Sequence, residues 1–387
     1  MIYKKFLCCV SLLFLSSCSS TTNTAPAPEQ LTDLLKHNLV LLPDIKFEHL
    51  PLDLEEKEII FLGEYKHNVK PLHKIAERLA VYLATHKPVV YAMELCYGAH
   101  PLMEAVSLGN EKTINPMLYP KTIQAFNSSQ TADKKILLTA IDIEHSIYNN
   151  KKETALFLQD LAGRSTSEAT RRIIQEDIPQ LTTQDTFDKV DRYLKKLKGV
   201  FIHHLDTFSL EDQEEILFSL DLLQASNQSY QYTSTQGGDW KNPLVLRGWE
   251  IREKYFTKTV ERAYRTARER EAILLCRVGV PHSFLTDKRY QARYFAKKYS
   301  LTKGKVASIG LVPLYYDIRE TNDNVTEKHN DIDSIVKTLM KDNKYSYLSL
   351  SELQKNTDNS FKWSNYYGSS GPKHDGLLFV RIEKNPN

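Results

Sequence analysis

Cysteine is scarce in this chain, and the positions of the few cysteines exclude several kinds of site. The 387 residues contain five: Cys8, Cys9, Cys18, Cys96 and Cys276. No CxxC pair and no Cys/His spacing of a zinc site occurs, which excludes these common metal motifs. Cys8, Cys9 and Cys18 lie near the N-terminus, so Cys96 and Cys276 remain for the folded part. Two alternatives stay open for them, a disulfide in an oxidising compartment or two buried thiols.

A strong charge of one sign is also missing. The sequence has 51 Lys and Arg against 48 Asp and Glu, a formal net charge of +3, and the basic residues are spread among the acidic ones. A nucleic-acid partner requires a basic patch or stripe, so this balance argues against nucleic acid. No internal repeat is present, and the low-complexity sequence is confined to a short polar segment near the N-terminus.

The N-terminus predicts export. Lys4 and Lys5 precede the apolar run Phe6–Leu15, which is too short to span a bilayer and is typical of a secretory signal peptide, here residues 1–17. The sequence Leu-Ser-Ser-Cys that ends at Cys18 resembles the lipobox of bacterial lipoproteins, whose cysteine is acylated and becomes the new N-terminus.

These features predict a lipid-anchored protein of the bacterial cell envelope. Acyl chains including palmitate are expected on Cys18, because several chains make a stable membrane anchor. Residues 18–30 are expected to form a polar, proline-containing tether. Ser19 and Ser20 favour sorting to the outer membrane, facing the periplasm or the surface.

Short, nearly continuous apolar runs recur along the rest of the chain and predict strands buried on both faces. They cover Ile59–Leu62, Val89–Met93, Ile136–Ile143, Ile273–Val280, Val306–Val312 and Leu377–Ile382. Helix-like stretches such as Pro71–Ala84 alternate with them. The pattern predicts an α/β fold with a mostly parallel central sheet flanked by helices, in a single domain over residues 31–387.

The stretch between the third and fourth runs predicts helices. About residues 153–231 are expected to form a helical insertion that caps the carboxyl edge of the strands, which would shape a pocket and exclude water. Asn227–Pro243, with Gly237, Gly238 and Trp240, predicts a loop at the rim of that pocket. Two further polar stretches predict loops, Glu320–Lys328 and Asn356–Lys373.

A long amphipathic helix is predicted over Arg247–Glu271. Its apolar stripe would consist of Ile251, Tyr255, Thr259, Ala263 and Ala267. Arg252 and Glu253 fall near its beginning, where they are as consistent with surface charges as with a site.

Polar side chains stand at the carboxyl ends of four predicted strands. They are Glu64 and His67 after the first, Glu94 in the second, Asp142, Glu144 and His145 at the third, and His282 after the fourth. Ligands of open parallel sheets bind at the carboxyl ends of the strands. The set therefore predicts one site at this edge.

Each of these residues also has a structural alternative. A Glu three residues before a His can hold the imidazole in one tautomer and raise its basicity, but Glu64 could instead stabilise the start of a helix. Glu94 lies in an apolar string, where an unpaired charge is costly, so it needs a cation, a hydrogen-bond network or a metal. Asp142 could cap the next helix, and His73 could join the site or face solvent.

Together, the residues of these strand ends and of the long helix resemble those of a known family. Leu62-Gly63-Glu64-Tyr65-Lys66-His67, a helix, and then Ala92-Met93-Glu94 are similar to the opening of the erythromycin esterase and ChaN-like superfamily, which includes the Tiki/TraB proteins. Arg252-Glu253 at the start of a helix and Gly279-Val280-Pro281-His282 at the end of a strand resemble its later blocks in the same order. The resemblance covers about Ile59 to Leu285.

The resemblance implies two functions. Esterase-like members imply a hydrolase in which His67 is the base on water, Glu64 and Glu94 orient it or bind a metal, and Arg252 and His282 form the electrophilic side. In ChaN-like members, which are haem-binding lipoproteins, one residue fewer separates the Glu from the His and a further His follows, as His73 does here. Asn68 stands where the esterase pattern has Gly.

The predicted lipid anchor favours ligand binding over hydrolysis, because the ChaN-like members are lipoproteins. The leading hypothesis is a small-molecule-binding lipoprotein, with haem, iron or another divalent metal as the first candidate and His73, Glu253 and Asp142 among the binding residues. Haem held between two copies would require a homodimer. The alternatives are a hydrolase that uses His67 and a degenerate scaffold that mediates envelope contacts.

Overall fold

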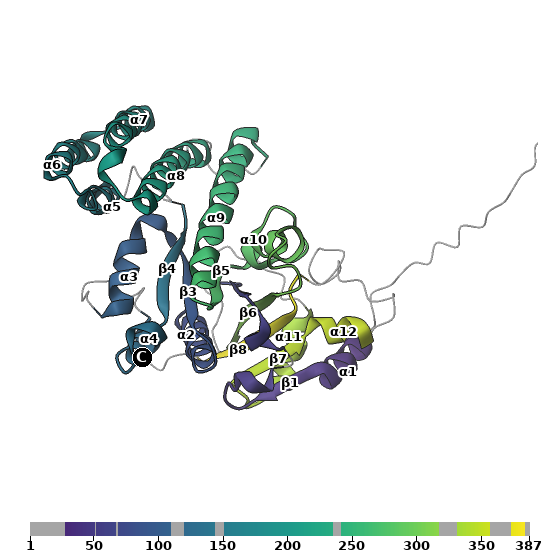
Figure 1. Cartoon of the computed structure of the whole chain (residues 1–387). Coiled ribbons are helices and arrows are strands. Elements are labelled where there is room, and N and C mark those ends of the chain that lie inside the picture. The colour runs from purple at the N-terminus through teal and green to yellow at the C-terminus, as the bar shows by residue number, and fades with distance from the viewer. Residues whose placement is uncertain are drawn as a thin grey trace, which may run out of the picture.

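One mixed sheet forms the centre of the molecule in the computed structural model, which describes residues 28–50, 52–66, 69–109, 120–143, 151–234, 241–316, 331–356 and 373–383. The described strands are β1 Leu39–Leu42, β2 Ile59–Glu64, β3 Val89–Cys96, β4 Leu137–Asp142, β5 Ile273–Gly279, β6 Val306–Tyr316, β7 Tyr345–Ser349 and β8 Gly376–Glu383. They form an eight-stranded sheet in the order β1-β7-β8-β6-β2-β5-β3-β4 (Figure 1). Within it β7 pairs antiparallel with both of its neighbours, and the other pairings are parallel.

The predicted α/β fold is confirmed, and each of the six predicted strands is present within a few residues of its expected bounds. β1 and β7 were missed. β1 has four residues and follows a helix directly, so its Leu and Val letters continue the helical pattern. In β7, Tyr and Ser alternate, which gives no continuous apolar run. Both strands lie at the side of the sheet farthest from the predicted site.

Helices cover both faces of the sheet. The described α-helices are α1 Pro28–Asn38, α2 Lys70–Ala84, α3 His100–Leu108, α4 Lys121–Asn127, α5 Lys151–Gly163, α6 Glu168–Asp177, α7 Phe187–His203, α8 Leu210–Ser234, α9 Pro243–Glu269, α10 Gln291–Arg293, α11 Asp331–Met340 and α12 Leu350–Asn356. α2 buries Leu72, Ile75 and Leu79 against one face, as its apolar period predicts. α9 packs on the opposite face with Phe256 and Val260, while α1, α11 and α12 cover the β7–β8 side.

The described residues between β4 and α9 are mostly helical and stand beside the β3–β4 end of the sheet (Figure 1). Their helices α5 to α8 share a core of their own, which includes Leu158, Leu194 and Leu223. That core also contains Tyr97, directly after β3, and Ile143, directly after β4. The helices are therefore joined to the carboxyl ends of these two strands.

Two sequence predictions for this region need correction. The predicted loop Asn227–Pro243 was too long, because α8 continues to Ser234 and Asn227 is a buried helical residue that donates to the Phe187 carbonyl. The buried stripe of α9 differs from the predicted one only in its first part. Thr259, Ala263 and Ala267 are buried as predicted, whereas Ile251 and Tyr255 are half-buried and Arg252 and Phe256 are buried in their place.

Candidate functional site

The sheet order brings the four predicted strand ends together. β2, β5, β3 and β4 are consecutive neighbours, and all four run parallel. Their carboxyl ends therefore meet at one edge, the position where open α/β sheets bind ligands. Glu64, Glu94 and Asp142 lie in the ends of β2, β3 and β4, and His282 follows β5 in the short 3-10 helix Val280–Ser283.

Arg252 of α9 joins three carboxylates at this edge. Its Nε and Nη2 donate to the two oxygens of Asp142 at 3.2 and 2.6 Å, the bidentate arrangement that suits a guanidinium. Nη2 also donates to Glu94 at 2.8 Å, and Nη1 lies 3.5 Å from Glu253. Asp142 is fully buried and Arg252 is 6% exposed. With His282 these four residues form what we call the arginine cluster.

His282 completes the arginine cluster between two carboxylates. Its Nδ1 lies 3.2 Å from Glu253 and 3.0 Å from the Gln291 side-chain oxygen, and its Nε2 lies 3.4 Å from Glu94. Burial alone would lower the pKa of His282, but Glu253 and Glu94 raise it to about 10. The imidazole is therefore a cation at neutral pH.

Glu94 has the cation that its apolar surroundings require. The β3–β4 register shifts between Met93 and Cys96, and Glu94 accepts from the Gly279 N–H at the end of the neighbouring strand as well as from Arg252. Burial raises the pKa of Glu94, but His282 and Arg252 outweigh it and hold the pKa well below its ordinary value. Glu94 is thus a fixed negative charge.

Glu64 belongs to a second set of contacts, which we call the Glu64 group: Glu64, His73 and Arg277. Its Oε1 lies 3.5 Å from His73 Nε2 on α2 and 3.6 Å from Arg277 Nε on β5. Glu64 is 5% exposed. Burial raises its pKa to about 7, with Arg277 opposing that rise and the charge of Glu94 adding to it. Glu64 therefore changes its charge near neutral pH.

Gly63 has a clear packing role beside these residues. A Cβ at position 63 would lie 1.9 Å from the Ser283 hydroxyl oxygen, so only glycine lets the segment after β5 pack this close to β2. That approach positions His282, the residue before Ser283, next to the end of β2. The glycine of the Gly-Glu motif is thus explained by backbone packing.

Several predicted residues lie outside the described part of the chain. They are His67, Asn68, Glu144, His145 and Cys18, and their roles stay predictions. Glu320–Lys328 and most of Asn356–Lys373 also fall outside it. Cys96 and Cys276 form no disulfide with each other, so the disulfide alternative is wrong. Cys276 pairs in register with Ala92, four residues before Cys96 on β3.

Sequence reasoning missed Gln291 and Arg277. Gln291 is fully buried and holds both His282, at 3.0 Å, and Glu253, to which its Nε2 donates at 3.0 Å. No motif marks it, because the short helix α10 follows a polar loop. Arg277 does carry a signal. It is a charge inside the apolar run of β5, the same anomaly that drew attention to Glu94.

A metal role finds no support in the geometry of the described residues. No group of three or more His, Cys, Asp or Glu side chains among them could hold a metal ion. In the arginine cluster the guanidinium of Arg252 lies between the carboxylates, where a cation would otherwise bind. Membrane-spanning character is likewise lacking in the described part of the chain, where no helix is long and apolar enough to cross a bilayer.

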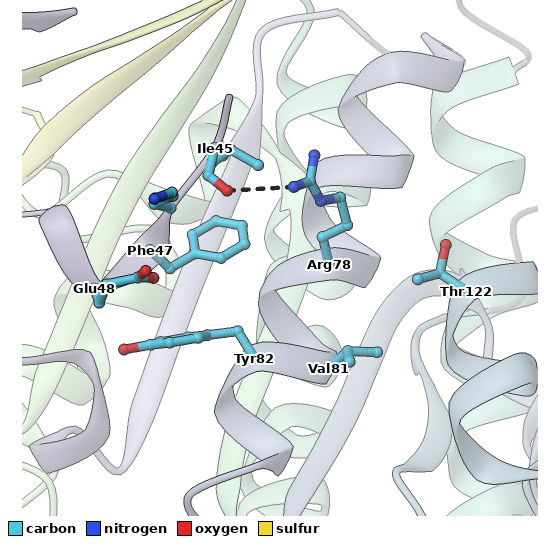
Figure 2. Close-up of a pocket in the computed structure, with 8 residues that line it drawn as sticks. Ile45, Phe47, Glu48, Arg78, Val81, Tyr82 and Thr122 are labelled. Carbon is cyan, nitrogen blue, oxygen red and sulfur yellow. Dashed lines mark hydrogen bonds between the residues drawn. The ribbon is translucent and has the colours of Figure 1, made fainter. Parts of the chain in front are cut away.

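Two cavities differ in their relation to this edge. One, of about 200 Å³, is lined by Ile143, Ser229, Tyr230, Thr233, Trp249 and Arg252 and so adjoins the arginine cluster. The other, of about 300 Å³, is lined by Ile45, Lys46, Phe47, Glu48, Arg78, Val81, Tyr82 and Thr122 (Figure 2). Its Arg78 points at the Ile45 carbonyl, at 3.2 Å, and also bonds Asp44. The second cavity contains no predicted site residue.

Comparisons with known proteins agree on the fold. No protein-family model matches the chain, and no curated protein matches it by sequence. Three solved structures do match. A Bacillus cereus protein from structural genomics has 12% identity and a TM-score of 0.61 over 92% of this chain and 98% of its own. A protein described as a succinoglycan biosynthesis protein has 11% identity and a TM-score of 0.63, with 93% and 98% covered.

The third structure is a histidine-to-asparagine mutant of the erythromycin esterase EreC, in its open conformation. It has 12% identity and a TM-score of 0.58, over 86% of this chain and 93% of its own. Identity this low is evidence of a shared fold and leaves the activity to be argued from the site. The chain therefore has an erythromycin esterase-like fold.

Proposed function

We propose that the chain is a hydrolase of an ester or lactone, with water as the nucleophile at the edge formed by β2, β5, β3 and β4. One observation carries the proposal: the two buried glutamates at this edge have different surroundings, because Glu94 contacts His282 and Arg252 at 3.4 and 2.8 Å and Glu64 lies 3.6 Å from Arg277, and these surroundings push their pKa values in opposite directions. The pKa of Glu64 is raised to about 7 and that of Glu94 is lowered. Opposite shifts in neighbouring carboxyls separate a proton-transferring group from a fixed charge.

Glu64 has the pKa of a base that works at neutral pH. A general base is most effective when its pKa lies near the operating pH. In the proposed reaction ionised Glu64 takes a proton from water, directly or through His67, while the water oxygen bonds to the ester carbonyl carbon. The protonated group then gives the proton to the leaving alcohol oxygen as the carbon–oxygen ester bond breaks. His67 as base remains a prediction from the sequence.

The arginine cluster would stabilise the negative charge that develops on the carbonyl oxygen. Arg252 Nη1 lies 3.3 Å from His282 Nε2. Because His282 is protonated, neither of these two nitrogens accepts a hydrogen bond, and an N–H of Arg252 remains for an oxygen ligand. Arg252 also lines the 200 Å³ cavity. Preorganised donors of this kind supply much of the rate enhancement in acyl transfer.

The test is a panel of esters and lactones, followed by acid release with a pH indicator. We expect the purified chain without its signal peptide to hydrolyse at least one of them. His67→Ala and Glu64→Gln should each lower kcat/KM roughly 100-fold or more. Matched controls are His203→Ala, at an exposed position on α7, and Glu48→Gln, in the cavity far from the edge. Equal rates in wild type, His67→Ala and Glu64→Gln would remove hydrolysis from contention.

Haem or iron binding, the leading sequence hypothesis, has a weaker basis in the described residues. Both ring nitrogens of His282 lie within about 3.5 Å of a carboxylate, so His282 would have to leave one of these partners to bind iron. Its surroundings therefore do not suit a haem ligand. A titration with haem that gives a Soret shift at micromolar concentration would restore this hypothesis.

We also propose that the protein is anchored in the bacterial envelope through Cys18. The support is the sequence of residues 1–27, which lie outside the described part of the chain; the predicted tether of residues 18–30 is too long at its end, because α1 begins at Pro28. Metabolic labelling with palmitate should mark the wild type and fail to mark Cys18→Ser. Label on both proteins would contradict the anchor.

A further inference from the structure

The cavity beside Arg252 has walls of a distinct chemical kind. Tyr230 and Thr233 of α8, Trp249 of α9 and Ile143 after β4 line it together with Ser229 and Arg252. Two of the three hydroxyls are already bonded to carbonyls: Ser229 donates to the Gly248 carbonyl at 2.7 Å and Thr233 to the Ser229 carbonyl at 3.1 Å. The third belongs to Tyr230, whose aromatic ring adds apolar surface to the wall. The Ser229 and Thr233 side chains therefore add little unsatisfied polarity.

The charges that line this cavity do not favour an ionic ligand either. Arg252 is the one charged side chain among the lining residues, and its guanidinium is bonded to Asp142 and Glu94. That guanidinium lies over the Trp249 ring, with 5.1 Å between its central carbon and the ring centre. The cavity therefore presents an aromatic and aliphatic surface next to a neutralised cation, which favours an uncharged apolar group.

The shape of the cavity is set by the close crossing of α8 and α9. A Cβ at Gly248 would lie 2.8 Å from the Ser229 carbonyl oxygen, so glycine is needed for the two helices to approach this closely. Gly248 immediately precedes Trp249, and Ser229 immediately precedes Tyr230. The contact between the helices thus holds both aromatic walls in place.

We propose that this cavity binds a single uncharged ring of the ester substrate and determines its specificity. The proposal rests on the hydrolase function proposed above. A cavity of about 150 Å³ is known to bind benzene, so about 200 Å³ holds one six-membered ring with a short substituent. It is below the roughly 300–1,000 Å³ of sites for larger ligands, so a whole macrolactone ring does not fit inside. The ring reaches the cavity while its ester group lies at Arg252.

The ring can belong to the acid or to the alcohol part of the ester, and substrates distinguish the two. Methyl phenylacetate carries it on the acid and benzyl acetate on the alcohol, with methyl acetate as the reference without a ring. We expect one of the two ring esters to exceed methyl acetate in kcat/KM by at least tenfold, the scale of adding apolar groups to a fitted pocket. Trp249→Ala should bring that ratio close to one.

A ratio separates specificity from general damage. If Trp249→Ala only disturbs the arginine cluster, kcat/KM falls equally for ring esters and for methyl acetate, and the ratio between them is unchanged. The control is Tyr255→Ala, an aromatic on the same helix that is outside the cavity, which should keep the wild-type ratio. A ratio unchanged in Trp249→Ala would overturn the proposal.

Binding of an unreactive probe tests the cavity without hydrolysis. The chain has three tryptophans, so benzyl alcohol or phenylacetamide in the cavity should change the fluorescence of Trp249. Trp249→Phe keeps the aromatic wall and should lose the change, with Tyr255→Ala behaving as wild type. Probe binding without hydrolysis of any ester would sink the proposed function and keep the ring site. Hydrolysis without probe binding and without ring preference would overturn the ring site and support the proposed hydrolase function.

Discussion

The arginine cluster and the Glu64 group lie at the same edge of the sheet, yet they hold their charges in opposite ways. In the arginine cluster, Arg252 contacts Asp142 and Glu94 at 2.6 and 2.8 Å. In the Glu64 group the carboxylate is 3.5 Å from His73 and 3.6 Å from Arg277. His282 and Arg252 together keep the pKa of Glu94 low, whereas burial outweighs the contact with Arg277 and raises the pKa of Glu64.

This difference shows how one structural element can supply two kinds of carboxylate. Both residues are glutamates near the carboxyl ends of parallel strands, β2 and β3, and both are mostly buried. What differs is the charge around each: Glu94 contacts the two cations His282 and Arg252, whereas burial dominates at Glu64 and Arg277 opposes it. The fixed charges of the arginine cluster suit electrostatic stabilisation, and the variable charge of Glu64 suits proton transfer.

The largest expected effect is the loss of Arg252. In Arg252→Met the fully buried Asp142 loses the cation that binds it, and Glu94 and Glu253 keep only their contacts with His282 in the arginine cluster. Breaking a buried ion pair from one side costs about 3–5 kcal/mol, which would leave the chain marginally folded. Unfolding by urea at pH 7 measures the change. The control Arg265→Met removes an exposed arginine that pairs with Glu214, which should cost at most about 1 kcal/mol. If both variants lose the same free energy of unfolding, the arginine cluster contributes no more to stability than a surface ion pair.

The candidate site was predicted from the ends of strands. Glu64, Glu94 and Asp142 could be predicted because apolar runs with abrupt polar ends are local patterns. Their meeting at one edge followed from the parallel arrangement of the sheet. The strand order, in which β5 lies between β2 and β3, depends on long-range packing and could not be obtained from spacing.

The partners within the site were much less predictable. Arg252 and Glu253 are adjacent on a helix rich in charge, and no local pattern separates them from surface residues. Gln291 reaches His282 from a segment nine residues later. Arg277 could have been found, because a charge inside a buried strand requires a partner just as Glu94 does.

The next effect in size is a pH-dependent gain in stability for Glu64→Gln. In the folded chain Glu64 keeps its proton up to about pH 7, whereas its ordinary pKa is 4.5. The folded state therefore binds more protons in this window, and the free energy of unfolding of the wild type falls as pH rises from 4.5 to 7. Glu64→Gln lacks this cost, so it should exceed the wild type by about 3 kcal/mol at pH 8 and match it near pH 4.

Glu94→Gln is the matched opposite in the same urea titrations. The folded pKa of Glu94 lies below its ordinary value, so its contribution is present above about pH 4.5 and is lost as pH falls. This variant should be less stable than the wild type at pH 7 and approach it in acid. If both glutamine variants shift stability in the same direction at pH 8, the contrast between the two glutamates is wrong.

A smaller effect is expected for Arg277→Gln, and it concerns the pH profile. Arg277 opposes the rise in the pKa of Glu64. Without this cation the pKa should rise further, and the acid limb of kcat/KM should move to higher pH by about one unit or more, since a charge pair at about 4 Å interacts by several kcal/mol. Arg289→Gln, which removes an exposed arginine bonded to Asp287, should leave the profile unchanged. An acid limb that stays in place would mean that Glu64 is not the titrating group.

The smallest effect should come from Gln291→Met, which removes a neutral member of the surroundings of the arginine cluster. Gln291 accepts from His282 Nδ1 and donates to Glu253, so its loss leaves buried polar groups short of one partner at a cost of about 1–3 kcal/mol. Because Glu253 remains 3.2 Å from the same nitrogen, His282 should stay protonated and the basic limb of the pH profile should not move. Gln228→Met, at an exposed position on α8, should change stability by less than about 0.5 kcal/mol. A basic limb that falls in Gln291→Met would show that the charge of His282 depends on its neutral partner as well as on the carboxylates, and the arginine cluster would then be less fixed than its short contacts indicate.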